Sequence, residues 1–305
     1  MNAENQYTGA LLALLAVIIW SGNFVVARAI IHDISPFSLS FFRWLSATVC
    51  ILPFAIKNIK KDWNAIKRSM HYLFWVSFTG ITLFNTFIYI GGHYTTAINL
   101  ALIGTTSSPI IAIILARIFL KEQVGWLKLA GIFLCVSGVL FLLSKGEWRN
   151  LVSFHFSVGD KWVIVGATCF AIYNVLTRKK PADISGISFL GVIFSLGTIL
   201  LIPFYAWDLT YAPPIHWSAN LVYIILFLGI GSSVISYLLW NNAIQRLGAG
   251  RTAIFGNLLP IFSSIEAALI LHESFTWVHV VGMVLVFAGI LLANFSLFRA
   301  KPAQA

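Results

Sequence analysis

The sequence predicts an all-α integral membrane protein in which ten transmembrane helices form two inverted repeats of five around a central cavity. Three observations lead to this fold class. First, 59% of the 305 residues are hydrophobic and 10% are charged, with a mean hydropathy of +0.89, whereas soluble domains carry about 25% charged residues. Second, ten apolar stretches come close to the roughly 20 residues that a spanning helix needs. Third, the pattern repeats after about 150 residues.

Each of the ten apolar stretches is interpreted as one helix, and most connections between them are short. The first is too long for the apolar part of a signal peptide and has no basic segment before it, so we expect it to be retained. Sustained two-residue alternation is absent, which argues against a β-barrel. In chain order the stretches are residues 9–31, 36–56, 71–91, 97–120, 126–144, 157–177, 186–204, 219–241, 249–271 and 277–297.

Lysine and arginine predict the orientation, because cytoplasmic connections of membrane proteins are enriched in both. With a cytoplasmic N-terminus, fifteen of these residues fall on the cytoplasmic side and four on the outer side, and Arg43 lies within a span. Both termini are therefore expected in the cytoplasm, and the protein is expected in the inner (plasma) membrane. The four outer residues are Arg28, Lys145, Arg149 and Lys161.

The repeat is clearest in the fifth and tenth stretches. Leu-x-Glu precedes each, a tryptophan follows four residues after the glutamate, and the stretch carries two glycines seven residues apart. Further matches at an offset of 150 or 151 residues occur along the whole chain. They pair Arg28 with Arg178, Ile51–Phe54 with Leu201–Phe204, Gly80 with Gly231, Pro109 with Pro260, Glu122 with Glu273, Trp126 with Trp277, Gly131 with Gly282 and Gly138 with Gly289.

The ordered matches predict two homologous halves, residues 1–148 and 149–305. Each half has five predicted helices. Because five is odd, the second half enters the membrane the other way up. Inverted repeats of this kind place the substrate site between the halves, near the middle of the bilayer.

The two halves, each ending in proline, Leu-x-Glu, tryptophan and the spaced glycines, resemble the EamA-type families of the drug/metabolite transporter superfamily over nearly the whole chain. The resemblance implies ten helices, cytoplasmic termini, a central cavity and export of small metabolites. The aromatic-rich interior is more narrowly similar to the bacterial exporters of aromatic amino acids.

Most of the repeated residues have structural interpretations. Glu122 and Glu273 precede a helix, where a carboxylate caps free N–H groups. Glycines seven apart share a helix face and allow close packing, and Trp126 with its counterpart is expected at the membrane interface. Pro109 and its counterpart each follow a polar residue by three positions, Thr106 and Asn257. These two side chains either line the cavity or bond back to their own helix.

Amide and aromatic side chains fall together on single faces of four helices, because residues three or four apart lie side by side. Asparagine facing lipid is costly, so these faces are expected to point inward. They would form an aromatic, amide-lined substrate site, with interhelical hydrogen bonding and ordinary packing as the alternative. The predicted cavity residues are Trp20, Asn23, Asn85, Tyr89, Thr106, Tyr173, Asn174, Tyr237, Trp240, Asn241 and Asn257.

Glu266 is the acid predicted deepest within a span, and such a group is a functional hypothesis by default. It could couple transport to protons. On an ideal helix it lies opposite Asn257, so both would face one cavity only if Pro260 turns the axis. Arg43, also within a span, either pairs with an acid or reaches outward.

Other functions are less consistent with the sequence. Gly231-Ser232-Ser233-Val234 fits the loose Gly-x-Ser-x pattern of intramembrane serine proteases, a remote alternative, but no histidine is predicted at that depth. A phosphate-binding loop and a Cys/His cluster are both absent, so no ATP, cofactor or metal is expected. The expected partners are a small-molecule substrate and the lipid bilayer, not nucleic acid. Amino acids are the favoured substrates, and cationic drugs or a nucleotide sugar are the alternatives.

Overall fold

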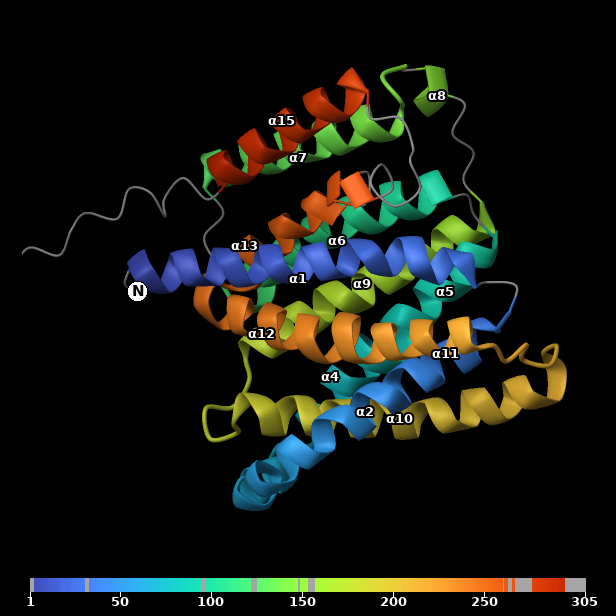
Figure 1. Cartoon of the computed structure of the whole chain (residues 1–305). Coiled ribbons are helices and arrows are strands. Elements are labelled where there is room, and N and C mark those ends of the chain that lie inside the picture. The colour runs from blue at the N-terminus through green and yellow to red at the C-terminus, as the bar shows by residue number, and fades with distance from the viewer. Residues whose placement is uncertain are drawn as a thin grey trace, which may run out of the picture.

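The computed structural model describes residues 3–30, 33–94, 97–121, 125–147, 149–152, 157–259, 261–262, 265–266 and 276–293. Within these ranges the regular structure is entirely helical, as predicted, and the helices pack as a bundle of rods (Figure 1). The predicted caps Glu122 and Glu273, Pro260 and the loop at Thr95 lie outside the described residues. So do the side chains of Asn23, Thr106 and Pro109.

In its described residues, the first half of the chain forms seven α-helices and one π-helical segment. Most connections between these helices are short, as predicted. The elements are α1 (Ala3–Ala29), α2 (Pro36–Lys61), α3 (Trp63–Arg68), α4 (Met70–Ser77), the π-helix η1 (Phe78–Leu83), α5 (Phe84–Tyr94), α6 (Ala97–Phe119) and α7 (Trp126–Leu143).

The second half repeats this order. A single helical turn, α8 (Arg149–Val152), precedes it. The remaining elements are α9 (Val158–Arg178), α10 (Gly186–Tyr211), α11 (Ala219–Leu226), the π-helix η2 (Phe227–Ile235), α12 (Ser236–Leu247), α13 (Ala249–Ile254), the 3₁₀ turn η3 (Phe255–Leu258) and α15 (Trp277–Ala293).

Five segments of the described chain are long and apolar enough to cross a bilayer: Asn5–Gly22, Pro36–Lys61, Met70–Tyr94, Gly186–Tyr211 and Ala219–Leu247. Three shorter apolar helices are Ile110–Phe119, Trp126–Phe141 and Trp277–Ala293. The described helices overlap all ten predicted stretches, and α2 and α10 extend beyond the predicted ends.

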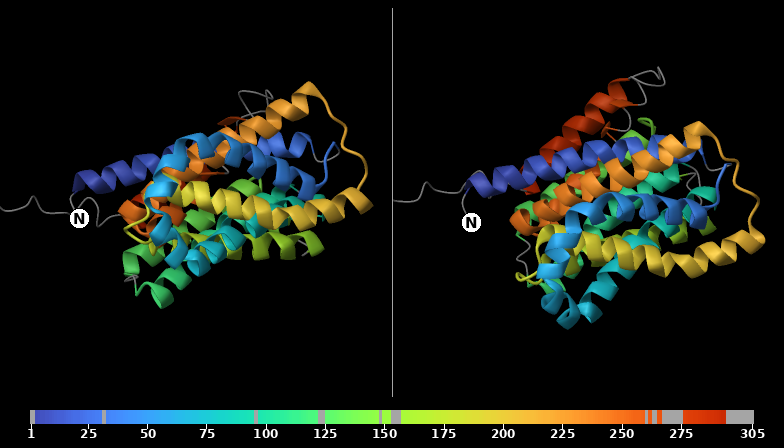
Figure 2. Two further views of the ribbon diagram at one scale, coloured as in Figure 1. Left: turned by 90° about the horizontal axis from the view of Figure 1, so that it is seen from below. Right: turned by 60° about the horizontal axis from the view of Figure 1, so that its bottom comes forward.

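Corresponding helices of the two halves contact one another. α2 packs along α10 and α7 along α15, while α1 packs on α12 as α9 packs on α5 (Figures 1 and 2). The chain direction, followed by colour, shows that α7 and α15 run antiparallel (Figure 1). The contacts are therefore those of two similar halves related by an approximate twofold axis.

The axis passes between α2 and α10, where equivalent residues meet. The Thr48 and Thr198 hydroxyls are 2.9 Å apart and hydrogen-bonded. One turn away, the ring centroids of Trp44 and Phe194 are 5.0 Å apart. Both pairs are 150 residues apart in sequence, so these helices cross at equivalent positions.

At each end of these two helices, an aspartate at the end of one helix accepts hydrogen bonds from serines at the start of the other. Ser35 caps α2, and the buried Asp208 near the end of α10 accepts hydrogen bonds there from Ser38 N (3.1 Å), Ser38 Oγ (2.6 Å) and Ser35 Oγ. At the opposite end Asp62 accepts from the N–H of Ser185, the cap of α10, at 2.9 Å. These bonds satisfy first-turn donors that a helix leaves free.

The glycines of α7 and α15 let the two backbones touch, as the sequence predicts. A Cβ on Gly131 would lie 2.5 Å from the Gly289 carbonyl oxygen, and one on Gly138 would lie 3.0 Å from that of Gly282. Cys135 Sγ, between them, is 3.5 Å from the Val286 oxygen. Close approach of this kind replaces the hydrophobic driving force that helices lack within a bilayer.

The π-helical segments η1 and η2 occupy equivalent places, in the middle of α4–η1–α5 and of α11–η2–α12. A π-turn pairs residues five apart and is frequent at functional sites. Side chains supplement its backbone bonds: Ser233 Oγ donates to the Leu228 oxygen (2.9 Å) and Ser236 Oγ to the Gly231 oxygen (3.1 Å). Gly80 and Gly231, matched in the sequence repeat, both lie in these segments.

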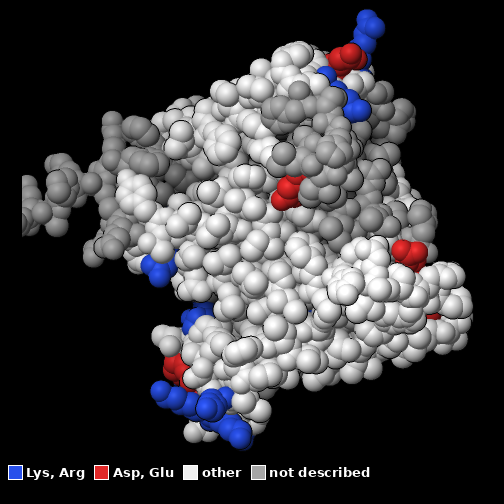
Figure 3. Space-filling model, viewed as in Figure 1, with Lys and Arg blue, Asp and Glu red and all other residues white. Residues whose placement is uncertain are grey.

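Charged side chains are concentrated at the ends of the bundle, and most of the visible surface between them is uncharged (Figure 3). Basic residues gather where α2 ends and α3 begins, on the same side as the start of α1 (Figures 1 and 3). This group consists of Lys57, Lys60, Lys61, Lys67 and Arg68, with Arg68 paired to Asp183. Trp126 and Trp277 are 80% and 64% exposed, as expected of residues that face lipid near a membrane interface.

Candidate functional site

A cavity of about 70 Å³ lies between the two halves, where α1, α2, α5 and α6 meet α9, α12 and α13. It has room for several water molecules. Ten of its lining residues are Trp20, Arg43, Phe84, Asn85, Ile88, Ser108, Phe170, Tyr237, Trp240 and Leu259. Four of these, Trp20, Asn85, Tyr237 and Trp240, are among the predicted site residues.

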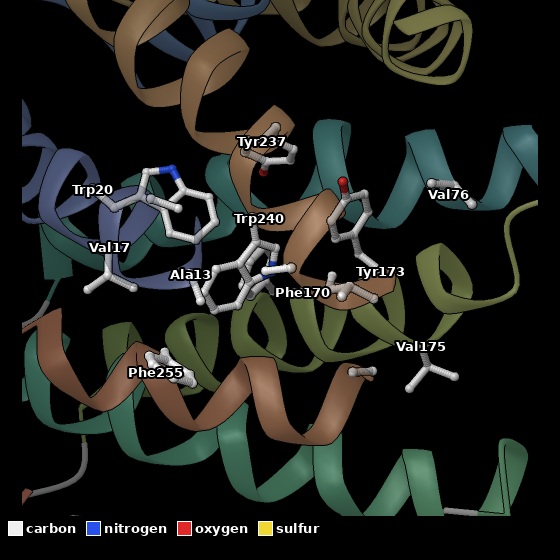
Figure 4. Packing of buried hydrophobic residues seen from close by; sticks show 14 of the residues in the cluster. Ala13, Val17, Trp20, Val76, Phe170, Tyr173, Val175, Tyr237, Trp240 and Phe255 are labelled. Carbon is white, nitrogen blue, oxygen red and sulfur yellow. The ribbon is translucent and has the colours of Figure 1, made fainter. Parts of the chain in front are cut away.

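The aromatic wall of the cavity consists of Trp20, Phe84, Phe170, Tyr237 and Trp240, which come from four helices. Figure 4 shows Trp20, Phe170, Tyr237 and Trp240 close together. The Trp20 ring centroid lies 4.9 Å from that of Trp240 and 5.7 Å from those of Phe170 and Tyr237, the last two edge-to-face. Phe84 stacks on Phe170 at 4.4 Å. Aromatic pairs prefer these arrangements, so the wall holds its shape and offers faces and edges to a flat guest.

The polar tips of the tryptophans are tied to the protein. Trp20 Nε1 donates to the Ser232 oxygen of η2 at 2.7 Å, and Trp240 Nε1 donates to Asn174 Oδ1 at 2.8 Å. Buried indole N–H groups normally find such partners. Both bonds cross between helices, so they fix the rings that line the cavity.

The neighbouring tyrosines are held in the same way. Tyr173 donates from its hydroxyl to Asn241 Oδ1 at 2.6 Å, and the Tyr237 hydroxyl donates to the Gly80 oxygen of η1 at 3.1 Å. A Cβ on Gly80 would lie 2.0 Å from the Tyr173 ring. The absence of a side chain at Gly80 therefore lets the tyrosine pass close to the π-turn.

The predicted residues thus separate into two groups. Trp20, Asn85, Tyr237 and Trp240 line the cavity, whereas Tyr173, Asn174 and Asn241 are buried but do not line it. Of these three, Asn174 holds the Trp240 ring and Asn241 accepts from Tyr173. Asn257 is fully buried, and its Nδ2 donates to the Ile254 oxygen at 3.0 Å, the local back-bonding considered as the alternative.

Arg43 is the cavity residue whose role the sequence left open. It is 1% exposed and lines the cavity. Its Nε donates to Ser233 Oγ at 2.9 Å, and Nη1 donates to the Tyr89 hydroxyl at 2.7 Å. Tyr89, one of the predicted site residues, therefore contacts the guanidinium of Arg43. The arginine could have been suspected from sequence, because a charge within a span is costly unless it has a function.

Glu266 faces α1 and is not among the residues that line the cavity. Its Oε1 accepts a hydrogen bond from Ser21 Oγ at 2.7 Å, and its Oε2 is buried with no hydrogen-bond partner among the described residues. Ser21 directly follows the cavity residue Trp20, so the carboxylate lies one residue away from the aromatic wall. In the described part of the chain, no group of three or more His, Cys, Asp or Glu side chains could hold a metal.

Comparison with protein families identifies the repeat. Residues 7–144 and 157–295 each match the EamA-like transporter family. The chain belongs to this family. It is accordingly a multi-pass membrane transporter of small molecules, and its two halves are two copies of one family unit, as the sequence repeat and the antiparallel α7–α15 pair indicate.

Relatives of this EamA-like transporter cover nearly its whole length. An uncharacterized transporter of Archaeoglobus fulgidus is 30% identical over 95% of this chain and 98% of its own. The uncharacterized transporter YyaM of Bacillus subtilis is 30% identical over 92% of each. A probable amino-acid metabolite efflux pump of Escherichia coli is 24% identical over 96% and 97%. A solved crystal structure shares the fold, with a TM-score of 0.77 at 14% identity over 97% and 100%.

The serine pattern in η2 has a structural explanation within this EamA-like transporter. Ser233 Oγ donates to the Leu228 oxygen and accepts from Arg43 Nε, and the carbonyl of Ser232 accepts from Trp20. A nucleophilic serine needs an adjacent general base. Here both residues support the π-turn and the cavity.

Proposed function

We propose that this protein is a secondary transporter that exports small metabolites, foremost amino acids with aromatic or other apolar side chains, by alternating access. The observation that carries the proposal is the aromatic cavity between the two halves, built by equivalent helices of each repeat. Inverted-repeat transporters bind their substrates at this place and expose it to either side by rocking one part against another. The printed name of the Escherichia coli relative, a probable amino-acid metabolite efflux pump, supports the same substrate class.

The proposed membrane arrangement has ten helices, with halves 1–148 and 149–305, in the inner membrane. Both termini would be cytoplasmic. The group of basic residues at the α2–α3 end of the bundle supports this orientation, since it lies on the same side as the start of α1 (Figure 3) and lysine and arginine favour the cytoplasmic side.

The experiment is transport by purified protein in proteoliposomes. Vesicles loaded with unlabelled amino acid are given the same labelled compound, one member of a panel at a time, and exchange is measured. We expect exchange of bulky aromatic or apolar amino acids. Exchange of none of the panel, together with uptake of a cationic dye, would instead support the cationic-drug alternative.

Trp240→Ala provides the link between the cavity and transport. Losing one aromatic contact should weaken apparent affinity roughly 2- to 30-fold. Trp126→Ala is the matched control, because Trp126 is also a tryptophan but is 80% exposed and away from the cavity. Equal effects of the two substitutions, at equal expression, would show that the cavity is not the binding site.

A further inference from the structure

We propose that Gly256 determines the size of the substrate, because it leaves open the part of the cavity that receives the flat apolar group of an aromatic amino acid. The inference rests on the proposed transport function and deepens it: bulky aromatic substrates are accepted because position 256 carries no side chain. It follows from three properties of Gly256, which are its place on the cavity, the empty space beside it and the lack of a structural reason for glycine there.

Gly256 belongs to the wall of the cavity. It lies in the 3₁₀ turn η3, directly after α13, and lines the same cavity as the aromatic side chains Trp20, Phe170 and Trp240. Ala253, three residues earlier, is a further small residue of this wall. The turn packs against α1 and α6, so it is held among the helices that enclose the cavity. A guest that stacks on the indole rings therefore shares this enclosed space with Gly256.

A side chain at position 256 would enter empty space. No atom of the described residues lies within 4 Å of a Cβ built on Gly256. At other glycines inside the bundle an added Cβ would collide: it would lie 2.0 Å from the Tyr173 ring at Gly80 and 2.2 Å from the Ile81 side chain at Gly197. Protein interiors are close-packed. The unfilled space beside a glycine that lines the cavity is therefore part of the cavity.

Neither packing nor backbone conformation requires a glycine at this position. Glycine is favoured where φ is positive, which among the described glycines occurs at Gly146 and Gly248 and not at Gly256. Within a helical segment glycine is also less favourable than alanine. A glycine that lowers stability, and that serves neither a turn nor a close approach of helices, is explained by the space that it keeps free for the substrate.

Gly104 of α6 is a second glycine of this kind. It lines the same cavity, and a Cβ built on it would lie 3.6 Å from Val163 Cγ1, which is an ordinary van der Waals distance. Close packing therefore does not exclude alanine here. Gly104 and Gly256 come from different halves of the repeat, so both contribute to the space between the halves, where inverted-repeat transporters bind their substrates.

The experiment measures binding of labelled tryptophan, phenylalanine and leucine to the purified full chain. The parent is compared with Gly256→Ala and Gly256→Val. Because each added carbon takes room from the largest ligand first, we expect the ratio of tryptophan affinity to leucine affinity to fall from the parent through alanine to valine. The fall for Gly256→Val should be roughly 10- to 200-fold, the range that a small change in the volume of a hydrophobic pocket produces. Phenylalanine should be affected less than tryptophan.

Gly186→Val is the matched control. No atom lies within 4 Å of a Cβ built on Gly186 either, but this glycine is the exposed first residue of α10 and is outside the cavity. Its affinity ratio should equal that of the parent. Gly104→Ala tests the second glycine and should lower the ratio in the same direction as Gly256→Ala. The melting temperature of Gly256→Ala should be no lower than that of the parent, since the added methyl group meets no described atom.

The possible failures are distinguishable. If the parent binds tryptophan and the ratio is unchanged in Gly256→Ala, Gly256→Val and Gly104→Ala, the inference is wrong and the proposed function stands. Equal loss of all three ligands in Gly256→Val would assign the glycine to the conformation of η3 and also overturn the inference. If that variant does not fold, the two alanine variants decide by the same ratio. A parent that neither binds nor exchanges any amino acid contradicts the proposed function itself.

Discussion

Trp20 shows how one side chain joins packing to hydrogen bonding at this site. Its ring contacts three other aromatic rings of the cavity wall, and its indole N–H donates to Ser232 at 2.7 Å. The acceptor belongs to the π-turn η2, so the position of a side chain from the first half depends on the backbone of the second. Ser21, the next residue, bonds Glu266, which brings an acid close to the same wall without placing it in the cavity.

Glu266→Gln is the residue-scale prediction. Oε2 has no hydrogen-bond partner among the described residues and can take a proton, and glutamine mimics the protonated acid while keeping an oxygen for Ser21. We expect the variant to exchange labelled for unlabelled substrate as the parent does, but to lose stimulation by an imposed pH gradient. Both rates are measured side by side in proteoliposomes.

The control for this prediction is Ser21→Ala, which removes one hydrogen bond to Glu266 and leaves the carboxylate able to titrate. Its gradient response should persist. A normal gradient response in Glu266→Gln, with a lower melting temperature, would instead assign Glu266 a structural role. A parent without any gradient response would be a facilitative carrier.

At the scale of elements, α2 and α10 are joined at the centre and at both ends. The two ends use the same chemistry, an aspartate of one helix on the first turn of the other, yet they differ in burial. Asp208 is buried and accepts from Ser35 and Ser38. Asp62 lies at the surface end, where the N–H of Ser185 holds its pKa below the usual value. The stabilisation from Asp62 is thus present at neutral pH and is lost as pH falls through that lowered pKa.

Asp208→Ala should accordingly be more destabilising than Asp62→Ala. Removing the buried carboxylate leaves two serine hydroxyls and an N–H without their charged acceptor, a loss of about 1.5–3 kcal/mol. Solvent can replace the lost bond at the partly exposed Asp62, so we expect at most about 1 kcal/mol there. Thermal unfolding in detergent at pH 7 measures both. A larger loss for Asp62→Ala would contradict the interpretation of the two ends.

The α7–α15 pair allows a second prediction at this scale. A Cβ on Gly289 would lie 2.6 Å from the Gly131 carbonyl oxygen and 2.7 Å from the Cys135 nitrogen, both backbone atoms that cannot turn aside. Gly289→Ala should therefore cost about 1–3 kcal/mol. Gly186→Ala is the control, since no atom lies within 4 Å of its added Cβ, and its melting temperature should be nearly that of the parent. Equal melting temperatures for the two variants would mean that α7 and α15 pack differently.

The whole molecule is two copies of one family unit, in contact through equivalent helices. If the second copy is inserted the other way up, the end of α2 and the end of α10 face opposite sides of the membrane. Lys60, in the basic group at the end of α2, and Tyr211, at the end of α10, mark these two ends.

The topology prediction uses these positions. In a background with Cys50, Cys135 and Cys169 replaced, Tyr211→Cys should react with an impermeant thiol reagent in intact cells, and Lys60→Cys only after lysis. Tyr211 is 72% exposed, so the reagent can reach it. The reverse pattern would invert the orientation, and labelling of both in intact cells would mean that the two ends do not lie on opposite sides.

The sequence by itself determined the helical class, the repeat and the glycine-bearing faces of α7 and α15. These are local or periodic properties: a bilayer requires long apolar runs, and residues seven apart share a face whatever surrounds them. The same periodicity placed Trp20, Asn85, Tyr237 and Trp240 on inward faces, and the structure places these four on the cavity.

Only the tertiary structure decided how the inward-facing polar groups are used. Asn174 and Asn85 are alike by sequence pattern, yet Asn174 is bonded to Trp240 whereas Asn85 lines the cavity. Periodicity also does not predict that Arg43 donates to Tyr89 and Ser233. It does not predict that carbonyl oxygens of the π-turns in both halves accept from Trp20 and Tyr237. The physical reason is that spacing fixes the face on which a side chain lies, whereas its partner comes from another helix, and that pairing exists only once the helices have packed.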